Sequence, residues 1–110
     1  MTLARAKELY RRDYWDACRC DQLPPRLAPL VFDAAVNQGV ATAIKMLQQA
    51  LHIPNDGKIG PQTIACAKSA GAELPAVYMA LRAQRYAKTN GFERFGLGWF
   101  KRLFLVALEV

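Results

Sequence analysis

The sequence has few of the residues from which metal sites and disulfide frameworks are built. Its 110 residues include a single histidine, His52, and three cysteines, Cys18, Cys20 and Cys66. An odd number of cysteines gives no even disulfide framework, and a bond between Cys18 and Cys20 would close a strained small ring. These residues do not have the spacing of a zinc finger either. We therefore expect reduced thiols with packing roles, no metal site and no cofactor.

Long hydrophobic runs are also missing. The apolar stretch 97–110 has only 14 residues, and Lys101 and Arg102 interrupt it, whereas a membrane span needs about 20 apolar residues. Residues 1–10 carry charges where the apolar core of a signal peptide would lie. The expectation is a protein made in the cytoplasm without a signal peptide and without a membrane partner.

Acidic residues are in the minority, with 9 Asp and Glu against 15 Lys and Arg and a net charge of +6. Such a surplus favours anionic partners such as nucleic acid, acidic lipid or bacterial cell wall. The basic residues are scattered, however, and no nucleic-acid-binding motif is present, so nucleic acid is not expected as a partner. A hydrophobic content of 53% over the length of one domain predicts a single folded domain, residues 1–110.

No strand pattern dominates the chain, whose hydrophobic period is helical. A first helix is expected with Thr2 as its cap, followed by five more over 26–38, 40–51, 61–70, 75–89 and 99–109. Gly39 is expected to be a left-handed cap, and Gly96 and Gly98 are expected in a loop before the last helix. The helix 26–38 is apolar nearly all round, which is typical of a central helix. The fold is thus predicted to be all-α, with about six helices.

The segment 47–63, LQQALHIPNDGKIGPQT, combines helix anchors, a turn and a helix start. Leu47 and Leu51 share the apolar stripe of their helix, and Gln48 is expected outside it. Asp56-Gly57 reverses the chain and is the one place where a small β-hairpin is predicted. Gly60-Pro61 opens the next helix. LQ…L followed by DG-x-hydrophobic-G-P-x-T resembles the signature of peptidoglycan-binding domains, although most of these residues have structural roles.

The resemblance covers nearly the whole chain, from residue 6 to residue 103. LYRRDYW (9–15), FDAAVNQG (32–39) and FGLGW (95–99) resemble the C-terminal two-thirds of phage-endolysin-type N-acetylmuramidases of glycoside hydrolase family 108. VNQG followed by AIKMLQQ is similar to the helical lobe of phage lysozymes. The resemblance implies a lysozyme-like helical lobe that binds peptidoglycan, either its glycan strand or its stem peptide, in the periplasm or at the cell wall.

The catalytic motif of that family is absent. Its catalytic glutamate lies in an N-terminal E-G-G-Y motif, which this sequence lacks. Glycoside hydrolysis needs an acid of raised pKa at the scissile oxygen. Glu8 lies among cations, Glu73 and Glu93 lie at turns, and Asp56 belongs to a turn. We assign no catalytic residue and predict no independent hydrolase activity; the alternative is one part of a muramidase whose catalytic segment lies upstream or on another chain.

The candidate substrate-binding residues lie mainly on the helix 26–38. Asp33 and Asn37 are four residues apart and share a face, and Gln38 follows. The resemblance implies that they line the sugar groove, whereas the alternative is an internally satisfied polar patch. Trp15 lies off the apolar stripe of the first helix, so it is the better candidate for an aromatic platform under a sugar ring.

The last two helices supply one more candidate. Tyr86 lies on the helix 75–89 with Arg82 and Arg85, whose cations either form a solvated face or meet stem-peptide carboxylates. A bulky stripe on the last helix is predicted to be core: Trp99, Phe100, Leu103 and Phe104. A third class of function is a plain interaction protein, in which lobe surface left uncovered leads to a homodimer.

Overall fold

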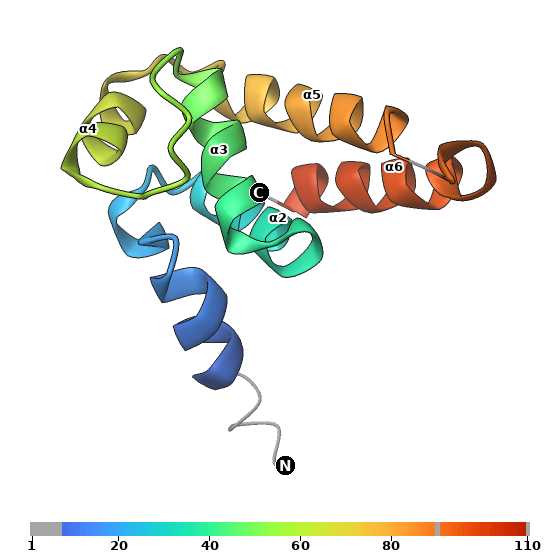
Figure 1. Cartoon of the computed structure of the whole chain (residues 1–110), viewed down its shortest axis with the longest axis horizontal. Coiled ribbons are helices and arrows are strands. Elements are labelled where there is room, and N and C mark those ends of the chain that lie inside the picture. The colour runs from blue at the N-terminus through green and yellow to red at the C-terminus, as the bar shows by residue number, and fades with distance from the viewer. Residues whose placement is uncertain (1–7, 90, 110) are drawn as a thin grey trace.

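A computed structural model describes residues 8–89 and 91–109, the side chains of residues 92–95 and 107–109 excepted. Within these residues all regular structure is helical, which confirms the predicted all-α fold (Figure 1). The elements are the π-helical η1 (Arg11–Asp16), the 3-10 helix η2 (Cys20–Gln22), α2 (Ala28–Gln38), α3 (Val40–Ala50), α4 (Pro61–Ser69), α5 (Leu74–Ala87) and α6 (Phe92–Glu109). The expected cap Thr2 lies outside the described residues.

The helix α2 is central, as its apolar surface predicts. It contacts α3, α5, α6 and both η segments (Figure 1). Pro29 lies in its first turn, where a missing N–H removes no helical hydrogen bond. Its buried side chains are Ala28, Leu30, Val31, Ala34 and Ala35. Burying a leucine or valine contributes roughly 1.5–3 kcal/mol, so α2 holds its neighbours together mainly through apolar contact.

Gly39 alone connects α2 to α3. Its N–H donates to the Ala35 carbonyl oxygen at 2.9 Å, and its own carbonyl oxygen accepts from the Ala43 N–H at 3.0 Å. The predicted positive φ is present at 97°, but ψ is 150°, so the residue is not a left-handed cap. Because one residue both ends α2 and begins α3, the C-terminal turn of α2 is held firmly against the next helix.

The C-terminus of α3 is closed by a Schellman motif. The His52 N–H donates to the Gln49 carbonyl oxygen and the Ile53 N–H to the Gln48 carbonyl oxygen, both at 3.1 Å. His52 adopts the left-handed φ of 57° that glycine usually adopts at this position.

Replacing His52 with glycine is expected to raise the free energy of unfolding by about 0.5–1 kcal/mol, because a β-carbon is strained in left-handed backbone. Thermal unfolding followed by circular dichroism should show a midpoint raised by about 2–5 °C. The matched control, Gln49→Gly, places glycine inside the last turn and should cost up to about 1 kcal/mol. A lower midpoint for H52G would contradict the prediction.

Gln48 is 1% exposed, so its predicted place outside the apolar stripe is wrong. Its Nε2 donates to Asp56 Oδ1 at 2.8 Å, to the Lys58 carbonyl oxygen at 3.0 Å and to Thr63 Oγ1 at 3.2 Å. Its Oε1 accepts from the Gly57 N–H at 3.0 Å. The polar residues of the segment 47–63 therefore form one hydrogen-bond network that ties α3 to the turn and to α4.

The predicted β-hairpin at Asp56-Gly57 is wrong, because residues 51–60, all of them described, contain no strand. Asp56 Oδ1 accepts from the Lys58 N–H at 2.9 Å, so turn groups that a ladder would pair are bonded to side chains instead. Gly57 has a φ of 75°, and a β-carbon there would lie 3.1 Å from Lys45 Cε. Both its conformation and its surroundings therefore favour glycine.

The hydrogen bonds of Asp56 in the turn 55–60 make the free energy of unfolding depend on pH. The Lys58 N–H and the Gln48 amide hold the pKa of Asp56 below its ordinary value of 3.8. A carboxyl whose pKa is lower in the folded state contributes stability above its unfolded pKa and loses it as the pH falls through the folded pKa. Asp56→Asn should therefore reduce the loss of stability below about pH 4, measured by urea unfolding at pH 7 and pH 3. An unchanged pH dependence in D56N would contradict this.

The last two helices, α5 and α6, lie side by side (Figure 1). The loop predicted around Gly96 and Gly98 is wrong, because α6 begins at Phe92 and runs through both. Packing outweighs the low helix propensity of glycine here, since Leu103 is 4% exposed and Trp99 stacks on α5.

The predicted core stripe of α6 is confirmed only in part. Leu103 is buried, and Trp99 and Phe100 are half-buried. Phe104 is 68% exposed, so its assignment to the core is wrong. None of the helices in the described part of the chain is long and apolar enough to cross a membrane.

Candidate functional site

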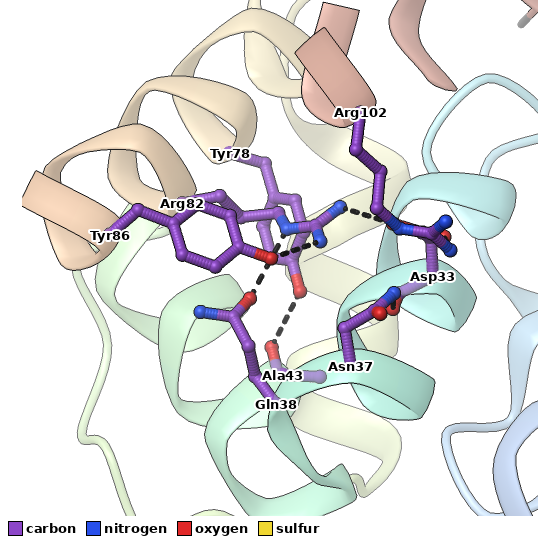
Figure 2. Close-up of polar contacts among 8 residues, drawn as sticks. All are labelled: Asp33, Asn37, Gln38, Ala43, Tyr78, Arg82, Tyr86 and Arg102. Atoms are coloured by element: carbon purple, nitrogen blue, oxygen red, sulfur yellow. Dashed lines mark hydrogen bonds and ion pairs between the residues drawn. The ribbon is translucent and has the colours of Figure 1, made fainter. Parts of the chain in front are cut away.

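A buried ion pair joins the central helix to α5. Arg82 Nη1 donates to Asp33 Oδ2 at 2.9 Å, and the side chains are 0% and 14% exposed (Figure 2). Arg82 therefore neither forms part of a solvated face nor reaches a stem peptide, and both predictions for it are wrong. Because each charge is compensated by the other, the pair can remain inside the fold.

Arg82 also brings two other predicted site residues together. Its Nε donates to Gln38 Oε1 at 3.3 Å and its Nη2 to the Tyr86 hydroxyl at 3.4 Å (Figure 2). Tyr86 in turn stacks on Trp99, with ring centroids 5.2 Å apart. Asp33, Gln38 and Tyr86 thus surround one guanidinium group, and α2, α5 and α6 meet there.

Asp33 has a second cation on its outer side. Arg102 of α6 donates from Nη2 to Asp33 Oδ1 at 2.7 Å, and its side chain is 52% exposed (Figure 2). Asn37 is exposed, and its amide donates to the Asp33 backbone carbonyl oxygen at 2.8 Å. Both oxygens of Asp33 are thus bonded to arginines, one buried and one at the surface.

Asp33 lines an open groove between η1, α2 and α6. This groove, which we name the Asp33 groove, has a volume of about 460 Å³. Its lining residues are Tyr10, Arg11, Trp15, Phe32, Asp33, Val36 and Arg102. A second cavity of about 370 Å³ adjoins it at Asp33 and Arg102 and is lined additionally by Gly98, Lys101, Leu105 and Val106. The two hollows give a surface with an apolar wall and basic edges.

Trp15 forms part of that apolar wall. Its ring packs edge-on against Phe32, with centroids 5.5 Å apart, and its Nε1 donates to Asp21 Oδ1 at 2.8 Å. The side chain is half-buried, so it is a fixed wall rather than a freely exposed platform. Trp15 and Asp33, which are 18 positions apart in the sequence, line the same groove.

A larger hollow of about 580 Å³ lies between α5, α6 and the start of α2. Its walls are almost entirely apolar, with Leu30, Met79 and Phe100 among them, and Arg26 is its one charged residue. It has no converging polar groups to orient a ligand, whereas the Asp33 groove has both apolar and charged ones. We therefore take the Asp33 groove as the candidate site.

The groove has no group placed for acid catalysis. Asp33 is bonded to two guanidinium groups, so neither of its oxygens faces the groove as a free acid. Cys18 and Cys20 are free, buried thiols in the core, and their mutual hydrogen bond lowers the pKa of Cys18 and raises that of Cys20. Among the described residues no group of three or more His, Cys, Asp or Glu could hold a metal ion.

Two arginines of the site, Arg82 and Arg102, were not predicted as partners of Asp33. A signal for Arg82 exists in the sequence, since Leu74, Tyr78 and Arg82 recur at steps of four and form the buried face of α5. Tyr78 is wholly buried, its hydroxyl donates to the Ala43 carbonyl oxygen at 3.0 Å, and burial raises its pKa. An arginine that continues such a stripe needs an internal carboxylate, and Asp33 is the only acid on the central helix.

The fold and the groove define an all-α module in which one groove is lined by both apolar and charged side chains. The family model described as "Predicted Peptidoglycan domain" matches residues 42–104, more than half of the chain, and the chain belongs to that family. The model of glycosyl hydrolase 108 matches residues 1–39. The predicted resemblance is therefore confirmed in both parts, and the two matches meet beside Gly39, where α2 joins α3.

A solved structure, that of Brucella abortus SagA, is similar to this chain. The two share 30% sequence identity with a TM-score of 0.93, over 99% of this chain and 63% of the SagA chain. The present chain thus corresponds to 63% of that relative's length. A search of curated proteins found no match.

Proposed function

We propose that this chain binds bacterial peptidoglycan through the Asp33 groove. Its membership of the peptidoglycan domain family carries the proposal. The groove supports it, because half-buried aromatic rings offer a face for a sugar and neighbouring polar groups fix its orientation. The net charge of +6 adds attraction toward an anionic wall.

The predicted site residues have unequal roles in this proposal. Trp15 lines the groove and contacts the ligand directly, and Asp33 lines it as well. Asn37 does not line the groove, but it is exposed on the same helix as Asp33, and its amide donates to the Asp33 backbone carbonyl oxygen. Gln38 and Tyr86 hold Arg82 in place, so they act on the ligand through Asp33. The place of action is the periplasm or the cell wall, and residues 1–110 act as one domain.

Retention on purified sacculi tests the proposal. Trp15→Leu keeps an apolar side chain against Phe32 and removes the ring face, so it should weaken retention about tenfold, the loss typical of a central aromatic contact. Phe104→Leu, which alters an exposed ring outside the groove, is the matched control and should bind as the unaltered chain does. Equal retention of an unrelated protein of the same charge in salt would overturn the proposal.

A second candidate is participation in glycan hydrolysis as part of a muramidase. The match of residues 1–39 to glycosyl hydrolase 108 favours it. In this case the chain alone should not release soluble fragments from sacculi, and addition of a segment that carries the family's catalytic glutamate should restore hydrolysis. Release by the chain alone, abolished by replacing one of its own acids, would contradict the assignment of no catalytic residue.

A homodimer remains a prediction. The exposed apolar residues of α6, Leu97, Phe104 and Leu105, are 88%, 68% and 52% exposed and would form its contact surface. Light scattering over a dilution series would reveal it.

A further inference from the structure

Arg102 lines the Asp33 groove and is held in place by an ion pair, yet half of its side chain is exposed. Its Nη2 is 2.7 Å from Asp33 Oδ1, yet the side chain is 52% exposed. Asp33 already compensates the buried Arg82 through the 2.9 Å pair on its other oxygen. Two guanidinium groups share one carboxylate (Figure 2). One positive charge is therefore left over, and Arg102 is the more exposed of the two arginines.

This arrangement prepares Arg102 for a second carboxylate. A guanidinium group has five N–H donors in a planar fork, and the contact with Asp33 occupies one nitrogen. The remaining donors can form a charge-assisted pair with a ligand carboxylate. Because Asp33 already orders the side chain, little additional side-chain entropy is lost when a ligand binds.

The groove around Arg102 favours an anion that is attached to a ring. Lys101 lines the adjoining cavity and has no ion-pair partner among the described side chains. Arg11, on the rim formed by η1, is paired with Asp21 at 3.1 Å and with Asp16 at 3.9 Å, so its charge is offset. Uncompensated positive charge therefore lies on the α6 side of a groove whose lining also includes the ring of Trp15.

We propose that Arg102 makes the groove selective for muramyl units whose stem peptide carries a free carboxylate, over neutral glycan and over the amidated peptide. This inference rests on the proposed function and names the part of peptidoglycan that the groove selects. The sugar ring lies against Trp15, and the carboxylate of its peptide pairs with the Arg102 guanidinium.

The test compares three ligands on the full chain by calorimetric titration. They are muramyl dipeptide with its free isoglutamine carboxylate, the same molecule with that carboxylate amidated, and neutral chitotriose. The acid should bind about tenfold more tightly than the amide, the gain typical of one charge-assisted hydrogen bond. In R102Q this ratio should fall to about one, and the acid should lose more affinity than chitotriose does. R102K should recover part of the ratio because lysine keeps the charge but not the fork.

Lys68→Gln is the charge-matched control, since it removes an exposed cation of α4 that does not line the groove. It should keep the full preference for the acid, and circular dichroism establishes that each variant is folded. Equal binding of acid and amide by the unaltered chain, with sacculus retention intact, overturns the role of Arg102 and leaves the proposed function standing. Loss of the preference in K68Q to the same extent as in R102Q also overturns it. Absence of sacculus retention overturns both.

Discussion

Replacing Arg82 with methionine is expected to lower the free energy of unfolding by about 3–5 kcal/mol, since removing one partner of a buried ion pair leaves the other charge uncompensated. Arg82 is 0% exposed and bonds to Asp33, Gln38 and Tyr86 at once. Methionine keeps much of the aliphatic length, so the loss arises mainly from the guanidinium group. A domain has only about 5–15 kcal/mol of stability, so R82M should unfold at a much lower urea concentration.

The matched control is R102Q, which removes the other arginine from the same carboxylate. Because Arg102 is 52% exposed, its ion pair is screened by solvent and should contribute no more than about 1 kcal/mol. A double variant, R82M with Asp33→Leu, replaces the whole buried pair by apolar groups and should be more stable than R82M alone. Equal losses for R82M and R102Q in urea unfolding would show that burial of Arg82 does not matter.

The helical architecture could be predicted from the sequence because it depends on local patterns. The apolar surface of α2 predicts a central helix, and the proline at the start of α4 predicts where that helix begins. Neither prediction requires knowing what the helix packs against. Gly96 and Gly98 would weaken an isolated helix, so the sequence predicts a loop where α6 in fact continues. Contacts with α2 and α5, through Arg102 and Trp99, maintain the helix across Gly98.

Of the residues that line the Asp33 groove, only Trp15 and Asp33 are among the site residues predicted from the sequence. Asp33, Asn37 and Gln38 follow from helical spacing on α2, but the partner of Asp33 is 49 positions away in the sequence. The spacing of Arg82 from Tyr78 places it on the buried face of α5. The contact of α5 with α2 belongs to the tertiary structure, so local spacing does not predict it. Trp15 was chosen for its exposure, and the structure shows a half-buried ring that lines the groove beside Asp33.

Gln48 shows a different limit of sequence reasoning. Its spacing from Ile44 and Leu51 places it on the apolar face of α3, whereas a polar amide is expected at the surface. A buried amide is stable only where its donors and acceptors have partners, and the turn 55–60 together with Thr63 supplies them. Residues of the family signature, among them Gln48, Asp56 and Thr63, are thus the residues that form the hydrogen-bond network.

Replacing Gln48 with alanine is therefore expected to lower the free energy of unfolding by about 2–3 kcal/mol, because the buried Thr63 hydroxyl and the half-buried Gly57 N–H both lose their hydrogen-bond partner. The Gly57 N–H and the Thr63 hydroxyl are the groups left without it. Gln49→Ala, next to it but exposed, is the matched control and should change stability by no more than about 0.5 kcal/mol. Urea unfolding followed by circular dichroism measures both variants, and equal effects would contradict the role of the network.

Sacculus binding by Q48A distinguishes the structural role of the signature residues from the binding role proposed for the Asp33 groove. Gln48, Asp56 and Thr63 do not line the Asp33 groove, so Q48A should retain sacculus binding at temperatures where it remains folded. W15L should show the reverse behaviour, with binding lost while the fold persists. If Q48A lost binding while still folded, the turn 55–60 itself would contact the wall, and the signature would have a recognition role in addition to its structural one.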